Sequence, residues 1–229
     1  MDGKIGAGDI REKPPSIFIF AGQSNMYGIT NFNYDAPVFP NVLICVKDHW
    51  ETYRPQPKSN FGPEYEFAKL WARDHPNEKI GILKYSVLGS AMEQWAPGSL
   101  LNNNLWLQYF GAGHIPVQAF FWMQGEADAD NPVERSNQYP KRLNSFVKNM
   151  RSILGDVPFV IGKTSWPGPY LPRIQAAQKE LERNLPGVYL IETADLPLRQ
   201  DHIHITEAGQ TEFGRRMYTT LYHIPPRTN

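Results

Sequence analysis

Six short apolar runs, each nearly continuous rather than alternating with polar residues, recur along this 229-residue chain. A strand that is apolar at every position is buried on both faces, as it is in a parallel sheet covered by helices. The runs are Ile17–Ala21, Val42–Val46, Ile80–Tyr85, Val117–Met123, Val157–Ile161 and Val188–Ile191. They predict the strands of a parallel sheet.

Helical patterns lie between the runs, with apolar residues three and four positions apart and proline or glycine at the ends. Four helices are predicted, at residues 63–76, 140–155, 171–185 and from an N-cap at Thr206. Alternating strands and helices predict an α/β sandwich. Because no internal repeat or linker is evident, we predict one domain, residues 16–224, after an N-terminal extension, residues 1–15.

The charge balance gives no indication of a nucleic-acid or membrane partner. Lysine plus arginine number 23, and aspartate plus glutamate also number 23, so no basic surface for nucleic acid or anionic lipid is predicted. No apolar run approaches the ~20 residues of a membrane span. The single cysteine, Cys45, excludes an intramolecular disulfide and a multi-cysteine metal cluster. Residues 1–15 lack the apolar stretch of a secretory signal, which leaves localisation open.

Polar segments follow the predicted strands, at residues 22–26, 47–49, 88–90, 124–126, 165–168 and 201–204. The carboxyl ends of parallel strands meet at one edge of a sheet, and ligands bind in the crevice outside that edge. Together the six segments predict a functional site there.

Ser24 directly follows the first strand and has two interpretations. It is either the N-cap of a short helix or a nucleophile that faces the crevice. The Gly-x-Ser-x-Gly elbow is absent, because Met26 stands at its last position. A nucleophilic serine needs a base, an acid that orients the base, and donors for an oxyanion.

Asp201 and His204 are the best candidates for that acid and base among the six histidines. Their spacing lets the carboxylate fold back onto the imidazole Nδ1 and leaves Nε2 for a serine. Two other interpretations stay open: His202 and His204 are ordinary loop residues, or they form part of a zinc site. Zinc needs three or four ligands, and no cysteine is near, so no metal is assigned.

Gly89 and Gln124 are candidates for the oxyanion donors, through a backbone N–H and a side-chain NH₂ respectively. A turn glycine and a capping glutamine are equally simple interpretations. Glu126 is a possible acid/base carboxylate, although no matched second carboxylate is identifiable. Among the tryptophans, Trp95 and Trp166 belong either to the core or to a surface that stacks on sugars.

Three blocks in this order resemble the SGNH hydrolase superfamily, in particular its sialate O-acetylesterase and plant acetylesterase branch, carbohydrate esterase family six. Residues 22–26 match the nucleophile block, residues 122–128 the Trp-x-Gln-Gly-Glu-x-Asp block and residues 201–209 the closing Asp-x-x-His block. The segment from Val87 to Trp95 resembles the Gly-Gly-Ser/Thr…Trp segment, except that Leu88 stands where the first glycine is usual. The resemblance spans about Ile17 to Tyr222.

The resemblance implies a three-layer, flavodoxin-like α/β/α sandwich with a roughly five-stranded parallel sheet. It implies a serine esterase that removes O-acetyl groups from a carbohydrate and needs no cofactor. Ser24 would be the nucleophile, His204 the base and Asp201 its orienting acid, with the oxyanion held by Ser24, Gly89 and Gln124. Supporting or substrate-binding roles fall to Asn25, Glu126, Trp95 and Trp166.

Two alternatives remain: an SGNH lipase or thioesterase acting on longer acyl esters, and a non-catalytic carbohydrate-binding protein. The expected partner is an O-acetylated sugar or polysaccharide. Sialic acid, xylan and bacterial polysaccharide all fit, and the oligomeric state is open.

Overall fold

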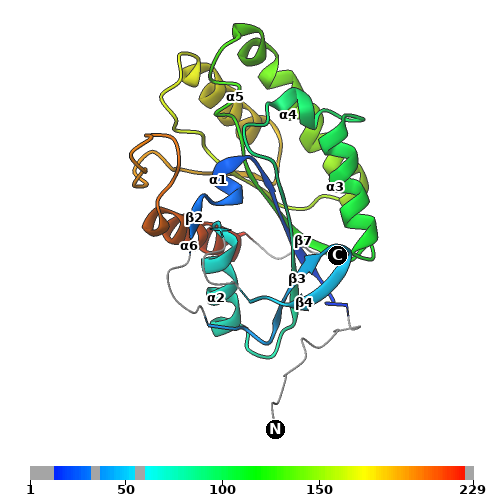
Figure 1. The fold of residues 1–229 in the computed structure, drawn as a ribbon. Coiled ribbons are helices and arrows are strands. Elements are labelled where there is room, and N and C mark those ends of the chain that lie inside the picture. Colours follow the sequence, from blue (N-terminus) through cyan, green and yellow to red (C-terminus); the bar gives the residue numbers. More distant parts are fainter. Residues whose placement is uncertain (1–12, 32–36, 55–59, 225–229) are drawn as a thin grey trace.

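A computed structural model describes residues 13–31, 37–54 and 60–224, and its centre is a seven-stranded sheet of order β4-β3-β6-β1-β7-β8-β9 (Figure 1). The strands are β1 (Ile17–Gly22), β3 (Val42–Val46), β4 (His49–Thr52), β6 (Ile80–Ser86), β7 (Val117–Met123), β8 (Phe159–Gly162) and β9 (Val188–Ile191). All neighbours are parallel except β3 and β4. All six predicted strands are confirmed, and the parallel part has six strands rather than about five.

Two further short strands, β2 (Thr30–Asn31) and β5 (Asn60–Phe61), form a separate antiparallel pair. Most of the predicted N-terminal extension, residues 1–15, lies outside the described residues.

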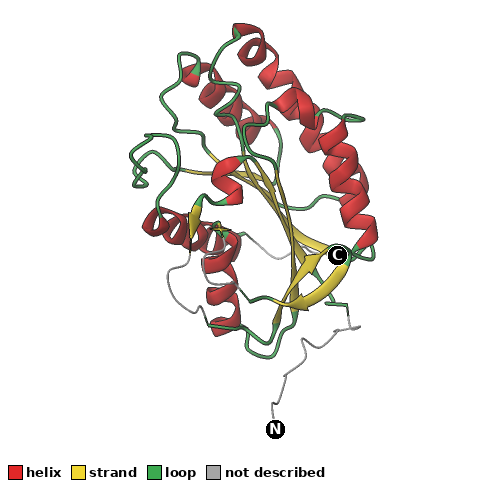
Figure 2. Cartoon of the chain, in the orientation of Figure 1, coloured by secondary structure: helices red, strands yellow, loops and turns green. Residues whose placement is uncertain are grey.

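Helices cover both faces of the large sheet and make three layers (Figure 2). The helices are α1 (Ser24–Tyr27), α2 (Glu64–Asp74), α3 (Leu100–Gly111), α4 (Val133–Leu154), α5 (Leu171–Asn184) and α6 (Glu207–His223), with a 3₁₀ turn, η1 (Met92–Trp95). Helices α3, α4 and α5 share one hydrophobic core with the sheet, and α2 and α6 share the other. Within the described residues, no helix is long and apolar enough to cross a membrane.

Strand β1 explains why the apolar runs are continuous. Ile17, Ile19 and Ala21 belong to the core under α3, α4 and α5. Phe18 and Phe20 point to the opposite core, under α2 and α6. Because every side chain of this central strand is buried, no polar position is tolerated until the strand reaches the edge of the sheet.

Two helices differ from the prediction. Helix α4 begins at Val133 rather than at Pro140, so Pro140 lies inside it. Its first two turns are mostly polar, and only Ser136 and Tyr139 are buried there, which leaves no apolar stripe to detect. Helix α3 was not predicted, because apolar residues lie on its buried side and also on its exposed side, at Leu100 and Leu107.

The β3–β4 hairpin corrects one part of the predicted site edge. Lys47 and Asp48 form its two-residue turn, and both have the positive φ that such a turn requires. On its other side, β3 pairs with β6 only along the first three residues of β6. Trp50 donates a hydrogen bond to the carbonyl of Ala112, just beyond α3. The segment 47–49 therefore lies beside the end of α3, and its predicted place at the functional edge is wrong.

Candidate active site

Ser24 is the first residue of α1, immediately after the central strand β1. Gly22 ends that strand with a φ of +146°, and a Cβ there would lie 2.0 Å from the carbonyl oxygen of Met123, so only glycine allows this close approach to β7. The N-cap position belongs to Gln23, which excludes the capping interpretation of Ser24. Among the described residues, the backbone N–H of Ser24 has no hydrogen-bond partner. Ser24 is thus a buried serine with an unused donor beside it.

Asn25 joins the serine to the segment that carries the predicted base. Its Nδ2 donates to the carbonyl of Ile203 at 3.1 Å, and its Oδ1 accepts from the N–H of Ile205 at 3.0 Å. These two bonds hold the backbone on both sides of His204. The residue next to Ser24 in sequence is therefore bonded to the backbone on both sides of His204.

Asp201 and His204 form the pair that their spacing predicted. The carboxylate Oδ2 lies 2.8 Å from His204 Nδ1, and Oδ1 accepts the backbone N–H groups of Ile203 and His204, both at 2.9 Å. Burial raises the pKa of Asp201, but these hydrogen bonds outweigh it and hold the pKa well below its usual value. Asp201 is therefore a fixed anion that orients the imidazole and leaves Nε2 available.

His202, the other histidine of this segment, is exposed and has a left-handed backbone, with φ of +57°. No group of three histidine, cysteine, aspartate or glutamate side chains suited to a metal occurs in the part of the chain that the structure describes.

Gly89 occupies a tight turn after β6. The N–H of Ser90 bonds to the carbonyl of Val87, and Gly89 has φ of +64°, which suits glycine at the third position of such a turn. Leu88 stands at the second position, outside the set of positive-φ residues, so it needs no glycine there. Its side chain is 56% exposed. The N–H of Gly89 also lacks a partner among the described residues, as an oxyanion donor should.

Gln124 lies at the end of β7 and is completely buried. Its Nε2 donates to the carbonyl of Ser90 at 3.0 Å and to Asp128 Oδ2 at 2.5 Å, which uses both amide protons. The same Asp128 oxygen accepts the N–H of Met92 at 2.8 Å. In this arrangement Gln124 holds the Gly89 turn, and it reaches an oxyanion only by exchanging one of these bonds.

Glu126 is buried and contacts the same Asn25 Nδ2 that donates to Ile203. Its Oε1 accepts from Asn25 Nδ2 at 2.7 Å, and its Oε2 has no partner among the described residues. Burial raises its pKa, while the bond from Asn25 and the nearby His204 act in the opposite direction. This carboxyl group supports the Asn25 junction, by which we mean Asn25 and its two bonds to the backbone on either side of His204.

The two tryptophans of the predicted site have different positions. Trp95 is fully buried, and its Nε1 donates to Ser90 Oγ at 2.9 Å, so it supports the Gly89 turn and offers no face to a sugar. Trp166 is partly buried, in the loop after β8, and packs against the core under α3, α4 and α5.

Sequence reasoning missed two buried glutamines that complete the junction. Gln23 Oε1 accepts the N–H groups of Gly125 and Ala127, both at 3.4 Å. Gln210 Nε2 donates to the carbonyl of Asn25 at 3.0 Å. One signal was present: Gln210 continues the apolar stripe of Phe213 and Met217 on α6, where an unexplained polar residue indicates a buried hydrogen bond.

Comparisons with known proteins identify the family and the fold. The model of the family "carbohydrate esterase, sialic acid-specific acetylesterase" matches residues 14–223. A probable carbohydrate esterase of Arabidopsis thaliana is 24% identical over 231 residues, which is 88% of each chain. A solved Arabidopsis thaliana structure superposes with a TM-score of 0.81 at 23% identity, covering 91% of this chain and 98% of its own. The structure of NanS gives 0.74 at 16% identity, with 92% and 98% covered.

Proposed function

Since the chain belongs to the family of carbohydrate esterases described as sialic acid-specific acetylesterases, we propose that it is a serine esterase that removes O-acetyl groups from a sugar hydroxyl. The carbohydrate acetylesterase class follows from the family. The proposal adds the catalytic residues and the order of events.

In the proposed reaction, Ser24 Oγ attacks the acetyl carbonyl while His204 Nε2 takes its proton. Asp201 holds the imidazole in the required tautomer. The N–H groups of Ser24 and Gly89 stabilise the negative charge that develops on the carbonyl oxygen. The sugar oxygen then leaves with the proton from His204, and an acetyl-serine remains. Water, activated by the same histidine, releases acetate and restores Ser24.

The Asn25 junction is the observation that carries this proposal. The Asn25 side chain, next to Ser24 in sequence, bonds to the backbone before and after His204, whose imidazole is paired with Asp201. This arrangement supports His204 as the base for Ser24. A carbohydrate-binding protein without activity has no need for an ionised aspartate behind a histidine at that place. The unused N–H groups of Ser24 and Gly89 support the same conclusion.

The test is Ser24→Ala, assayed with p-nitrophenyl acetate, with longer acyl esters and with a panel of O-acetylated glycans. We expect hydrolysis to fall by about 10⁴-fold or more, because the nucleophile is lost. Ser152→Ala, an exposed serine on α4, is the matched control. A Ser24→Ala enzyme that keeps its activity places the nucleophile elsewhere. A wild-type preference for long acyl chains points to the lipase or thioesterase alternative.

A further inference from the structure

Helix α1, which carries the proposed nucleophile, is a single turn. Ser24 begins it, and the N–H of Gly28 closes it by bonding to the Ser24 carbonyl at 2.9 Å. The last carbonyls of a helix have no partner within the helix, so a partner must come from another part of the chain. For Tyr27, the last residue of α1, that partner is a side chain of β6.

Lys84 of β6 contacts Tyr27 in two ways. It lies opposite Phe20 of the central strand β1, and its Nζ donates to the carbonyl of Tyr27 at 2.8 Å. The same Nζ lies 5.8 Å from the centre of the Tyr27 ring, within the range of a cation–π interaction. A lysine that bonds to a terminal carbonyl is a common way to end a helix. Lys84 therefore holds the end of α1 that is opposite to Ser24.

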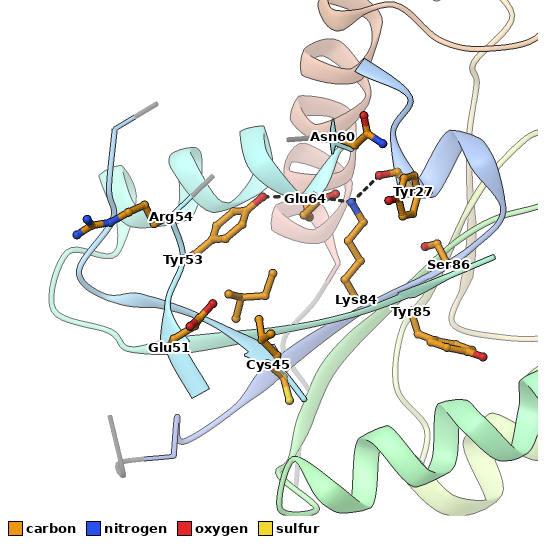
Figure 3. Close-up of a pocket in the computed structure, with 12 residues that line it drawn as sticks. Tyr27, Cys45, Glu51, Tyr53, Arg54, Asn60, Glu64, Lys84, Tyr85 and Ser86 are labelled. Atoms are coloured by element: carbon orange, nitrogen blue, oxygen red, sulfur yellow. Dashed lines mark hydrogen bonds and ion pairs between the residues drawn. The ribbon is translucent and has the colours of Figure 1, made fainter. Parts of the chain in front are cut away.

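Glu64, at the start of α2, holds Lys84 in turn. The side chains of Lys84 and Glu64 are 15% and 3% exposed, and Nζ lies 2.6 Å from Glu64 Oε1. The same oxygen accepts from Tyr53 Oη at 3.3 Å and from the N–H of Gly62 at 3.2 Å. Figure 3 shows these contacts running from Tyr53 through Glu64 and Lys84 to Tyr27. Because both charged groups are buried and paired, the ammonium group has little freedom to leave the Tyr27 carbonyl.

The segment before Glu64 also touches α1 directly. A Cβ at Gly62 would lie 2.4 Å from the carbonyl oxygen of Met26, and a Cβ at Gly28 would lie 1.7 Å from that of Phe61. The backbones on either side of the ion pair are thus in close contact. A movement of the ion pair is transmitted to α1.

We propose that Lys84 is a positioning residue of the esterase, and that its bond to the Tyr27 carbonyl sets the orientation of α1 and hence of the Ser24 hydroxyl and N–H; the inference rests on the proposed function. Lys84 acts through α1 and not on a reacting atom. Both the attack on the ester and one oxyanion contact depend on α1, so a small displacement slows the chemical step more than it weakens substrate binding.

The first test compares Lys84→Met with the control Lys69→Met, which breaks the pair between Glu66 and a half-exposed lysine on α2. We expect kcat for p-nitrophenyl acetate to fall about 10–100-fold in Lys84→Met, with KM changed by less than about 3-fold. Lys69→Met should keep both wild-type values. An unchanged kcat in Lys84→Met overturns the proposal, because the backbone contacts alone then hold α1.

The second test separates positioning from stability. Lys84→Met alone leaves the buried carboxylate of Glu64 without a counter-ion, which destabilises the fold. The double variant Lys84→Met/Glu64→Gln removes both charges, and the amide oxygen still accepts from Tyr53 and Gly62. Its unfolding temperature should return toward that of wild type, while kcat stays low because the Tyr27 carbonyl lacks its donor. A kcat that recovers together with the unfolding temperature overturns the proposal.

The third test measures the nucleophile itself. A fluorophosphonate forms a bond to an activated serine and releases fluoride, and mass spectrometry locates the label. At a temperature where both proteins are folded, Ser24 should be labelled about 10–100-fold more slowly in Lys84→Met/Glu64→Gln than in wild type. Absence of the label from Ser24 in wild type means that the proposed function fails, and this inference with it. Equal labelling of Ser24 in both proteins means that the proposed function stands and the positioning role of Lys84 fails.

Discussion

Asp201 accepts three hydrogen bonds, and all of them favour its ionised form. We expect Asp201→Asn to remain folded and to lower kcat by roughly 10²–10⁴-fold, because the imidazole loses the carboxylate that orients it. Steady-state kinetics with p-nitrophenyl acetate measure the effect.

Two other carboxylates are the controls for Asp201. Asp48→Asn should be nearly silent, since Asp48 lies in the β3–β4 turn beside the end of α3. Glu126→Gln should be intermediate, because it weakens the bond from Asn25 without touching the pair. If Asp201→Asn lowers kcat only slightly while Glu126→Gln abolishes most of it, Glu126 is the orienting acid instead.

Gln124 tests the oxyanion site. We expect Gln124→Ala to lower kcat by roughly 10²–10³-fold and to change KM less, because an oxyanion donor acts as charge develops. The structure adds a second route to the same loss, since the amide holds Ser90 and Asp128. Thermal unfolding, measured alongside, separates the two routes. A full kcat with a weakened KM would instead make Gln124 a substrate-binding residue.

At the scale of elements, Asn25 connects α1, the loop after β7 and the segment before α6. Asn25→Ala removes the bonds to Glu126, Ile203 and Ile205 and leaves a buried carboxyl group without a donor. We expect the free energy of unfolding to fall by about 1.5–3 kcal/mol, together with a loss of kcat. Urea denaturation and kinetics measure both quantities.

The control for Asn25 is Asn103→Ala, which removes one exposed bond to the carbonyl of Gly98. It should change neither quantity appreciably. Full activity in Asn25→Ala would show that the His204 segment is held in place by other contacts.

Elements were predictable from the sequence where burial follows a simple period. The six core strands were predictable because each carries a run of apolar residues that are mostly buried. The last helix was predictable too, and its N-cap Thr206 accepts the N–H of Gly209. Helix α3 was not, because its exposed side carries Leu100 and Leu107. Strand β4 was hidden because its side chains are mostly exposed.

The site was predictable in its residue types and less so in its contacts. The Asp201–His204 pair is local, so its spacing alone predicted its geometry. Asn25 and Gln23 act across about 100 to 180 positions of sequence, and no local pattern encodes such partners. The wrong prediction for Asp48 has the same cause. The position where β3 stops pairing with β6 depends on the register between the two strands, which no local pattern encodes.

For the whole molecule, the strand order places the site. From β1 the chain runs first to β3 and β6 on one side, and then crosses to β7, β8 and β9 on the other. In such a sheet, ligands bind at the point where the strand order reverses, outside the carboxyl ends of the strands. Ser24, which follows β1, stands at that reversal.

Stability of the whole molecule should depend on pH through Asp128. Burial raises its pKa from 3.8 to about 6, against the opposing bonds from Gln124 and Met92. The folded protein thus binds this proton more tightly than the unfolded chain does. The resulting stabilisation is complete below pH 3.8 and is lost as the pH rises through 6.

Asp128→Asn removes this titration and keeps an oxygen acceptor. The stability of wild type relative to the variant should therefore fall by about 2 kcal/mol between pH 4 and pH 7. Urea denaturation at both pH values measures the difference, in which the other carboxyl groups largely cancel. A difference that does not change with pH would mean that Asp128 titrates normally.

The proposed nucleophile is residue 24 and its proposed base is residue 204, and Asn25 bonds to Ile203 and Ile205 on either side of that base. During synthesis the serine leaves the ribosome some 180 residues before the histidine that activates it. If the proposed assignment holds, a nascent or cleaved fragment that carries β1 without residue 204 is inactive, however well it folds. Two fragments divided at an exposed loop regain a complete centre only by docking along the sheet. Ester cleavage can thus serve as a complementation signal, reporting the reassembly of two separately expressed halves.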